Sequence, residues 1–387
     1  MRIVADENIP LVEHFFGRYG EVVLRPGRAI SSRDLRDADA LLVRSATHVN
    51  DKILEGSPVR FIGSATIGTD HIEIENVEKR GIIFAHAPGS NADSVVEYVI
   101  AALLTISARK AVDLRGRTVG IIGCGSIGSR LAERLPAIGC RILLNDPPLA
   151  EQAEKAGRDH DFVRLQDLLA SSDIVSIHVP LTVSGRHLTR HLVDGPRLRN
   201  LLPGAWLVNT SRGSVVDNDA LRDNVGRLGA VVLDVWENEP EPDPRLVEKV
   251  DLATPHIAGY SYDGKVAGTR MLYEAFARFV GEDIDYAEDA AALAMPLIPP
   301  DPRMPEMDWL HQVVSRMYAI SEDDRSMRHG GGASPAEHFT RLRREYPVRR
   351  TFSAYSLQRL HVPGRFLEGV ERGLMVQTGS GPIAEGA

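Results

Sequence analysis

Three short polar segments in the second half of the chain hold side chains suited to oxidising an alcohol next to a carboxylate. They are NTSRG at 209–213, DVWENEP at 234–240 and PHIAG at 255–259. Each follows an apolar run typical of a β-strand. In an open parallel sheet, ligands bind beyond the carboxyl ends of the strands. We therefore expect the three segments to meet at one edge of a sheet.

The residue types in these segments match the needs of 2-hydroxy acid oxidation, which are a cation for the carboxylate, a base for the hydroxyl proton and an open path for the hydride. Arg212 can bind a carboxylate through two parallel hydrogen bonds. His256 can take the proton, because imidazole titrates near neutral pH. Glu239 can orient the imidazole and stabilise its charged form. Each of these residues, taken alone, has an ordinary structural explanation. The prediction of a catalytic trio therefore depends on all three occurring together.

A glycine-rich segment upstream has the spacing GxGxxG, between the apolar run TVGIIG and a segment typical of a helix. In that context the glycines permit a tight turn, close approach to a pyrophosphate, and close packing of helix on strand. Asp146 can accept hydrogen bonds from ribose hydroxyls, and no arginine directly follows it that could bind the 2′-phosphate of NADP. This favours NAD over NADP. The alternative to a cofactor site is an ordinary glycine-rich turn followed by a surface Asp. The predicted cofactor contacts are Gly123, Gly125, Ser126, Ile127, Gly128, Asp146 and, after a later strand, Thr210 and Ser211.

The elements that must position these residues form two series of alternating strands and helices, one over 1–87 and one from Thr118 onward. Such alternation predicts the α/β class, with parallel sheets and helices around them. A chain of 387 residues is too long to form a single hydrophobic core, so two or three domains are expected. A helix is expected over 262–281, followed by a proline-rich linker at 295–305 and a final segment with helices near 311–322 and 335–346. The small polar end from Gln377 is expected to fray.

Composition excludes several classes of protein. The net charge of −8 gives no overall attraction to nucleic acid or to an anionic membrane. The two cysteines, Cys124 and Cys140, are too few for a disulfide framework or a cysteine-based zinc site, and no metal site is expected. The N-terminus lacks a signal-peptide core, and the apolar stretch around 98–108 is too short to span a bilayer. We therefore expect a cytoplasmic protein with reduced thiols.

In the order GCGSIG, NTSRG, DVWENEP and PHIAG, the chain resembles the D-isomer-specific 2-hydroxyacid dehydrogenases over about residues 1–281. The resemblance implies two Rossmann-like domains, with the NAD domain at 93–256 inserted into a substrate domain at 1–92 and 257–285. It also implies that His256 is the acid/base, and that Asp234 and Gly259 lie on the nicotinamide side. Residues 286–387 would form a small C-terminal α+β domain with a disordered tail.

A narrower resemblance, to members acting on a phosphorylated acid, covers nearly the whole chain. It rests on RIVADENIP, LLVRSATHVN, SATIGTDHI, DPP, PHIAGYS and YPVRR. It implies a phosphate at the far end of the substrate and a C-terminal dimerisation domain, hence a homodimer. The residues expected to contact substrate are Arg44, Ser45, Thr66, Tyr260 and, in YPVRR, Arg349 or Arg350, reaching across a dimer. Val179 departs from the family, because many relatives have a small polar residue there.

Two alternatives stay open. The same fold could act on phosphoglycerate, glycerate or a hydroxypyruvate-type acid. In the sequence, only the loops around Ser45 and Thr66 and the C-terminal segment distinguish these substrates from the phosphorylated acid of the first interpretation. The chain could also be an NAD-responsive corepressor that binds partners and turns over little substrate. A panel of candidate acids separates these possibilities.

Overall fold

The computed structural model describes residues 1–284, 294–330, 332 and 334–379. The chain divides into two compact units, which are described separately. Unit 1 comprises Met1–Ala92 and Tyr260–Ala292, and unit 2 comprises Asp93–Gly259 and Leu293–Ala387. This differs from the expected division in two respects. Residues 257–259 group with the NAD domain, and so does the C-terminal segment, which we had expected to form a domain of its own.

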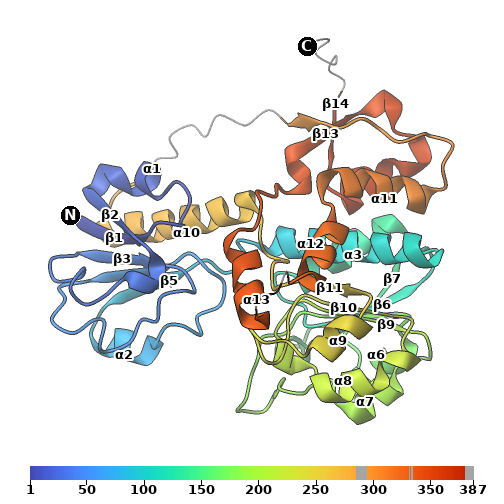
Figure 1. Cartoon of the computed structure of the whole chain (residues 1–387), viewed down its shortest axis with the longest axis horizontal. Coiled ribbons are helices and arrows are strands. Elements are labelled where there is room, and N and C mark those ends of the chain that lie inside the picture. Colours follow the sequence, from blue (N-terminus) through green and yellow to red (C-terminus); the bar gives the residue numbers. More distant parts are fainter. Residues whose placement is uncertain (285–293, 331, 333, 380–387) are drawn as a thin grey trace. The chain divides into compact units, whose positions relative to one another are not determined.

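The core of unit 1 is a five-stranded parallel sheet in the order β2-β1-β3-β4-β5 (Figure 1). Its first strand lies inside the sheet, and the later strands are added on both sides of it, as in a doubly wound fold. The strands are β1 (Arg2–Asp6), β2 (Glu21–Arg25), β3 (Ala40–Val43), β4 (Phe61–Ser64) and β5 (Ile83–His86). The helices are α1 (Val12–Phe16), α2 (Ile74–Lys79) and α10 (Tyr262–Val280), with 3-10 turns η1 (Gly17–Tyr19) and η2 (Gly27–Ala29).

Both faces of this sheet are buried, which explains why its strands are continuous apolar runs. Side chains alternate between the faces: Leu41 of β3 belongs to one apolar cluster and Leu42 to the other. Helix α10 covers the second face, with Leu272 and Phe276 fully buried against it.

Unit 2 contains a six-stranded parallel sheet in the order β11-β10-β9-β8-β6-β7. The direction of strand addition reverses between β6 and β8, so the turn after β6 lies at a topological switch point, where ligands bind in such sheets. The strands are β6 (Thr118–Ile122), β7 (Arg141–Asn145), β8 (Ile174–Ile177), β9 (Trp206–Asn209), β10 (Ala230–Leu233) and β11 (Leu252–Ala253). The helices are α3 (Ala92–Lys110), α4 (Gly128–Arg134), α5 (Pro147–Lys155), α6 (Leu165–Ser171), α7 (Gly195–Asn200), α8 (Asn218–Asn224) and α9 (Pro244–Lys249), with 3-10 turns η3 (Leu135–Ile138), η4 (Gly213–Val215) and η5 (Val225–Arg227).

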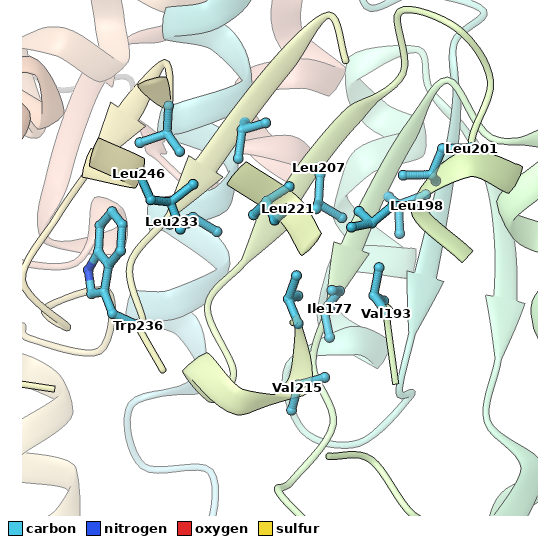
Figure 2. Close-up of a cluster of buried hydrophobic side chains, with 14 of the residues drawn as sticks. Ile177, Val193, Leu198, Leu201, Leu207, Val215, Leu221, Leu233, Trp236 and Leu246 are labelled. Carbon is cyan, nitrogen blue, oxygen red and sulfur yellow. The ribbon is translucent and has the colours of Figure 1, made fainter. Parts of the chain in front are cut away.

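The apolar cluster on one face of this sheet joins strand residues to the helices that cover them (Figure 2). Leu207 and Leu233 point from the strands, and Leu198, Leu221 and Leu246 contribute from helices. Each such side chain stabilises the fold by about 1.5–3 kcal/mol when fully buried. Trp236, in the segment that carries Glu239, belongs to the same cluster. The segment after β10 that carries Glu239 is therefore fixed directly to the core.

Aspartates start several helices of unit 2. Asp146, Asp194, Asp217 and Asp243 each precede a helix and accept a hydrogen bond from a backbone amide in its first turn. The carboxylates satisfy amides that have no partner within the helix, and their charge suits the positive helix N-terminus.

The C-terminal segment adds helices and a small parallel sheet to unit 2, in the order β12-β13-β14. Three details differ from expectation: strand β12 lies in the proline-rich linker, β14 lies in the supposed tail, and the first helix is broken at 318–319. Residues 380–387, also expected to fray, lie outside the described residues. The elements are β12 (Met295–Pro296), α11 (Glu306–Met317), α12 (Ile320–Arg328), α13 (Pro335–Arg344), η6 (Phe352–Ala354), β13 (Tyr355–Gln358), η7 (Arg359–His361), η8 (Gly364–Phe366), the π-helix η9 (Gly369–Gly373) and β14 (Gln377–Gly379).

This segment is tied to the NAD domain by buried polar contacts. Asp324 of α12 accepts a hydrogen bond from the Ala253 amide of β11 at 2.8 Å. Arg134 of α4 donates to the carbonyls of Gly373 and Leu374, at 2.9 and 3.1 Å. These contacts explain why the segment does not separate from unit 2.

The fold class expected from the sequence is confirmed: two doubly wound α/β sheets and a small C-terminal region of mixed helices and strands. In the part of the chain that the structure describes, no helix is long and apolar enough to cross a membrane.

Candidate active site

The segment carrying His256 follows the short strand β11 and is held by Asp234, the residue after β10. The backbone amide of His256 donates to the Asp234 carbonyl at 2.7 Å. The Asp234 carboxylate accepts from the amides of Ile257 and Ala258, at 2.8 and 2.9 Å, and from the Thr254 hydroxyl at 2.6 Å. Asp234 is 1% exposed. It therefore fixes the histidine loop, and the predicted nicotinamide-side contact of Asp234 and Gly259 stays a prediction.

His256 and Glu239 form a hydrogen-bonded pair, in which His256 Nδ1 lies 2.7 Å from Glu239 Oε2. The other oxygen, Oε1, accepts from the Trp236 amide at 2.9 Å. Burial alone would raise the pKa of the Glu239 carboxyl, but its hydrogen bond to His256 and the charge of that imidazole hold the pKa below its ordinary value. The Trp236 amide and Arg343 of α13 act in the same direction.

This pairing decides which imidazole nitrogen carries the proton and which keeps its lone pair. A carboxylate only accepts hydrogen bonds, so the proton between His256 and Glu239 belongs to Nδ1. Nε2 then carries the lone pair of the neutral ring. The pair has the geometry of a base held in one tautomer by an acidic residue.

Arg212 lies in the loop after β9, and the structure brings this loop against the segment that carries Glu239. The cause is Gly213: a Cβ at this position would stand 1.9 Å from the carbonyl carbon of Trp236. Only glycine permits that approach. Arg212 Nη1 donates to the Ser211 carbonyl at 2.9 Å, and the Arg212 carbonyl accepts from the Asn209 side chain at 3.0 Å. The arginine loop and the Glu239 segment thus lie side by side.

The glycine-rich turn follows strand β6, as predicted. It lies at the switch point of the sheet. Gly123 has φ +90°, and a Cβ there would stand 2.7 Å from the His178 carbonyl oxygen. A Cβ on Gly128 would stand 2.0 Å from the Gly123 carbonyl oxygen, which explains the third glycine. At Gly125, by contrast, no described atom lies within 4 Å of where a Cβ would be. That open backbone fits the close approach of a pyrophosphate.

Ser126 and Ile127 complete this turn and lead into α4. The Ser126 carbonyl accepts a hydrogen bond from the Arg130 side chain at 2.6 Å, and the Ile127 carbonyl accepts one from the Leu131 amide at 3.0 Å.

Asp146 follows β7 and contacts the same turn. Its Oδ2 accepts from the Cys124 amide at 2.8 Å, and its Oδ1 accepts from the Leu149 amide at 3.1 Å, capping α5. Each carboxylate oxygen has two acceptor positions, so these bonds leave capacity for ribose hydroxyls. The residue predicted to select NAD thus also braces the glycine-rich turn. Among the residues described, no group of three His, Cys, Asp or Glu side chains is placed to hold a metal ion.

Thr210 and Ser211 are buried next to Arg212, and both have partners. Ser211 bonds the Asn209 side chain through its amide and hydroxyl, at 3.1 and 2.8 Å. Thr210 Oγ1 lies 3.4 Å from Nδ1 of His178, whose Nε2 lies 2.7 Å from Ser176 Oγ. Burial lowers the pKa of His178 to about 3, so this ring is neutral at physiological pH. His178 therefore acts as a structural partner and brings no charge.

In unit 1, Arg44, Ser45 and Thr66 follow the adjacent strands β3 and β4, at the carboxyl edge of their sheet. Thr66 lies 2.8 Å from Ser64 Oγ, which lies 2.9 Å from His71 Nε2. Arg44 makes one long contact, 3.5 Å to the Asn8 carbonyl, and Ser45 is exposed. The structure thus brings these three predicted substrate residues to one sheet edge.

The remaining predicted substrate residues have separate places. Tyr260, in unit 1, has the Lys265 ammonium 5.0 Å from its ring centre. Arg349, in unit 2, is 6% exposed, and its Nη2 donates to the carbonyls of Ala258 and Ser94 at 2.6 and 3.3 Å. Its guanidinium also lies 4.3 Å from the Tyr318 ring centre. These contacts give Arg349 a structural role, and its predicted contact with the substrate phosphate stays a prediction. Arg350 is half-buried.

Sequence reasoning missed two residues of this site, Gly213 and Arg343, and one role of Asp234. Gly213 follows Arg212 directly, but no spacing pattern marks a glycine that touches distant backbone. Asp234 was predicted to contact the cofactor, and nothing in the sequence indicated that its carboxylate also accepts three hydrogen bonds from residues 254–258. Arg343, part of a basic helix, was not noticed, because its proximity to Glu239 follows from tertiary folding.

Comparison with known proteins identifies the matching regions. A family model described as the NAD binding domain of D-isomer specific 2-hydroxyacid dehydrogenase matches residues 102–258. A domain of unknown function matches residues 303–363. The erythronate-4-phosphate dehydrogenase of Salinibacter ruber is 49% identical over 387 residues, covering 97% of this chain and 99% of that protein. The protein of the same name from Chromohalobacter salexigens is 44% identical, covering 96% of this chain and 97% of its own.

Solved structures match about three quarters of the chain. The TT0316 protein of Thermus thermophilus superposes with a TM-score of 0.62 at 25% identity, covering 73% of this chain and 98% of that one. The NAD-dependent formate dehydrogenase of Staphylococcus aureus, crystallised with NAD, has a TM-score of 0.58 at 25% identity and covers 74% of this chain and 98% of its own. With an NAD-binding domain model and relatives that match from end to end, the chain is an NAD-dependent dehydrogenase and belongs to the D-isomer specific 2-hydroxyacid dehydrogenase family.

Proposed function

We propose that this enzyme oxidises 4-phospho-D-erythronate to 2-oxo-3-hydroxy-4-phosphobutanoate, with NAD as the hydride acceptor. The observation that carries the chemistry is the His256–Glu239 pair at 2.7 Å, which leaves Nε2 to receive a proton. The names of the full-length relatives support the choice of substrate.

In this proposal each member of the trio has one task. Arg212 holds the C1 carboxylate of the substrate through its guanidinium fork. His256 Nε2 takes the proton of the C2 hydroxyl while the hydride on C2 leaves, so that the C2–O bond becomes a carbonyl. Glu239 stabilises the imidazolium that results, without itself taking the proton. In the reverse reaction His256 returns the proton to the carbonyl oxygen.

The glycine-rich turn and Asp146 would hold NAD, which supplies the acceptor for the hydride. The Gly125 amide region and the start of α4 would meet the pyrophosphate, and the Asp146 carboxylate would meet the adenosine ribose. Thr210, Ser211, Asp234 and Gly259 would line the nicotinamide side. For the phosphate end of the substrate we propose Arg44 and Arg350 as cations, with Ser45, Thr66 and Tyr260 as hydrogen-bonding partners.

A substrate panel tests this proposal. Reduction of NAD is followed with 4-phospho-D-erythronate, 3-phospho-D-glycerate and D-glycerate, using the wild type and His256→Asn. We expect kcat/KM to be at least about 100-fold higher for the phosphorylated four-carbon acid than for D-glycerate, because a phosphate bound by charged partners contributes about 1.5–3 kcal/mol per hydrogen bond. A preference for D-glycerate or 3-phospho-D-glycerate would overturn the substrate assignment.

We further propose that the enzyme is a cytoplasmic homodimer that serves pyridoxal 5′-phosphate synthesis. The dimer proposal is supported by large apolar side chains that the C-terminal segment exposes, among them Val348 and Leu360, each 79% exposed. Light scattering of Leu360→Asp and Val348→Asp variants measures the oligomeric state, with Leu202→Asp, just after α7, as control. Monomers are expected from the first two; dimers from all three variants would contradict an interface at this segment.

A further inference from the structure

A buried arginine from the C-terminal segment holds the backbone next to the catalytic histidine. Nη2 of Arg349 donates to the Ala258 carbonyl at 2.6 Å and to the Ser94 carbonyl at 3.3 Å. Ala258 lies two residues after His256, and Ser94 lies in the first turn of α3. The chain passes between its two units at three points, of which 92/93 and 259/260 lie within two residues of these carbonyls. One guanidinium nitrogen therefore binds the backbone of unit 2 beside two of the three crossings.

The histidine loop needs such contacts because its backbone is strained. His256 has φ +58°, in the left-handed region that side chains other than glycine rarely adopt. A conformation of this kind persists only when its surroundings hold it in place. Asp234 holds the loop through amides, those of Ile257 and Ala258. Arg349 holds it through a carbonyl, that of Ala258, so the peptide units after His256 are bound from both sides.

Tyrosine side chains and a carboxylate surround the buried Arg349 guanidinium, whose Nε and Nη1 have no hydrogen-bond partner among the described residues. The Tyr318 ring lies under the guanidinium, with 4.3 Å from Cζ to the ring centre. The Tyr318 and Tyr346 hydroxyls both donate to Asp323, at 2.7 and 2.8 Å, which places a carboxylate in the same cluster. Nearby, Glu97 Oε1 of α3 accepts from the Phe352 amide at 2.8 Å. The segment around Arg349 is thus fixed to α3 at two points.

We propose that Arg349 is a positioning residue for the dehydrogenase reaction, holding the Ala258 carbonyl so that His256 keeps the orientation in which Nδ1 meets Glu239. The inference depends on the proposed role of His256 as acid/base. It assigns the C-terminal segment a part in catalysis that is separate from any role in dimerisation. A lysine would end one bond short of Nη2, so it would restore the carbonyl contact only partly.

The test compares Arg349→Met and Arg349→Lys with Arg328→Met in the full-length enzyme. Arg328 of α12 is a matched control, because its guanidinium also donates to two carbonyls of unit 2, those of Val247 and Val250, at 2.5 and 2.9 Å. Loss of Arg328 weakens the attachment of the C-terminal segment, including the pairing of Arg328 with Asp324 that neighbours β11, but removes no hydrogen bond to residues 256–259. The readouts are kcat, KM, the Kd of NAD, the Tm, and hydrogen exchange of the Ile257 and Ala258 amides.

Arg349→Met is expected to lower kcat about 10- to 100-fold, because a small displacement of a catalytic group has effects of that size. The Kd of NAD should change less than about 3-fold, and Arg349→Lys should recover part of kcat. Arg328→Met should lower Tm and keep kcat within about 3-fold of wild type. Exchange of the Ile257 and Ala258 amides should accelerate in Arg349→Met and stay unchanged in Arg328→Met.

Equal losses of kcat in Arg349→Met and Arg328→Met, in proportion to Tm, would overturn the proposal, as would unchanged exchange at Ile257 and Ala258. Arg349→Lys provides the same comparison if the methionine variant does not fold. Hydrogen exchange needs no substrate, so it tests the anchoring even if the wild type oxidises no acid in the panel. In that case the proposed function fails, while the anchoring of the loop is judged separately.

Discussion

The polar side chains at the carboxyl edges of the two parallel sheets differ in how far they are buried and hydrogen-bonded. In unit 2, His256, Glu239 and Asp234 are buried or half-buried and bonded to one another or to adjacent backbone. In unit 1, Ser45 is exposed and the Arg44 guanidinium has a long hydrogen bond, 3.5 Å, to the Asn8 carbonyl, while Thr66 is bonded to Ser64. The difference is expected if the first edge performs chemistry and the second recognises substrate. Catalytic groups gain from being fixed beforehand, whereas long cationic side chains become ordered when an anion binds.

The comparison predicts its largest effect at His256. Replacing it with Asn removes the base and should lower kcat by about 100- to 10,000-fold, the range that general base catalysis supplies. The Kd of NAD, measured by fluorescence titration, should stay within about 3-fold of wild type. His361→Asn, an exposed histidine of the C-terminal segment, is the matched control and should keep full activity. Turnover near wild type in His256→Asn would exclude the assigned role.

Glu239→Gln should have the second largest effect. The amide can still accept from Trp236, but it no longer favours a proton on the imidazole, so kcat should fall about 10- to 100-fold with a smaller change in KM. Glu241→Gln, exposed and two residues away, serves as the control. If steady-state kinetics show the same kcat for both variants, Glu239 does not stabilise the imidazolium.

Arg44→Ala tests the recognition edge and should change a different constant. Loss of one cation for the phosphate should raise KM for 4-phospho-D-erythronate about 10-fold, with kcat within about 3-fold of wild type. Arg36→Ala, an exposed arginine of the same unit, should leave both constants unchanged. A fall in kcat at constant KM would instead place Arg44 with the groups that act only in the transition state, and the contrast between the two edges would fail.

The sequence predicted both parallel sheets because strands buried on two faces are continuous apolar runs separated by helices. It also predicted that the NTSRG, DVWENEP and PHIAG segments meet, because each follows a strand. It did not predict β14, since Gln377–Gly379 is polar and becomes a strand only by pairing with β13. Pro296 is tolerated in β12 because that strand lies at the edge of its sheet.

Dependence on distant parts of the chain also explains why the sequence did not predict the burial of Arg349. In the sequence, YPVRR is typical of a basic solvated turn. The structure buries this arginine because Tyr318, Asp323 and the carbonyl groups that receive it come from distant parts of the chain. Long-range compensation of a buried charge has no local pattern, so the sequence did not predict that Arg349 contacts the backbone beside His256.

The last prediction concerns stability and leaves activity aside: the free energy that burying the carboxyl of Glu97 in α3 costs the folded protein. Burial raises the pKa of Glu97 to about 8, although Arg134 and the Phe352 amide lower it. The folded protein therefore holds a proton on Glu97 that the unfolded chain releases near its ordinary pKa of 4.5. Between these values the unfolded state binds fewer protons, so the free energy of unfolding attributable to this group falls as pH rises, and levels off above about pH 8.

Glu97→Gln should remove this dependence, because the amide does not titrate and its oxygen can still accept from Phe352. Urea unfolding of both proteins from pH 5 to pH 9 measures the difference directly. Relative to wild type, the variant should gain stability steadily up to about pH 8, by at most a few kcal/mol. Parallel curves across this range would mean that Glu97 is ionised in the folded state, paired with the cations around it. The buried cluster that holds the Arg349 segment would then be a charged network with no pH-dependent penalty.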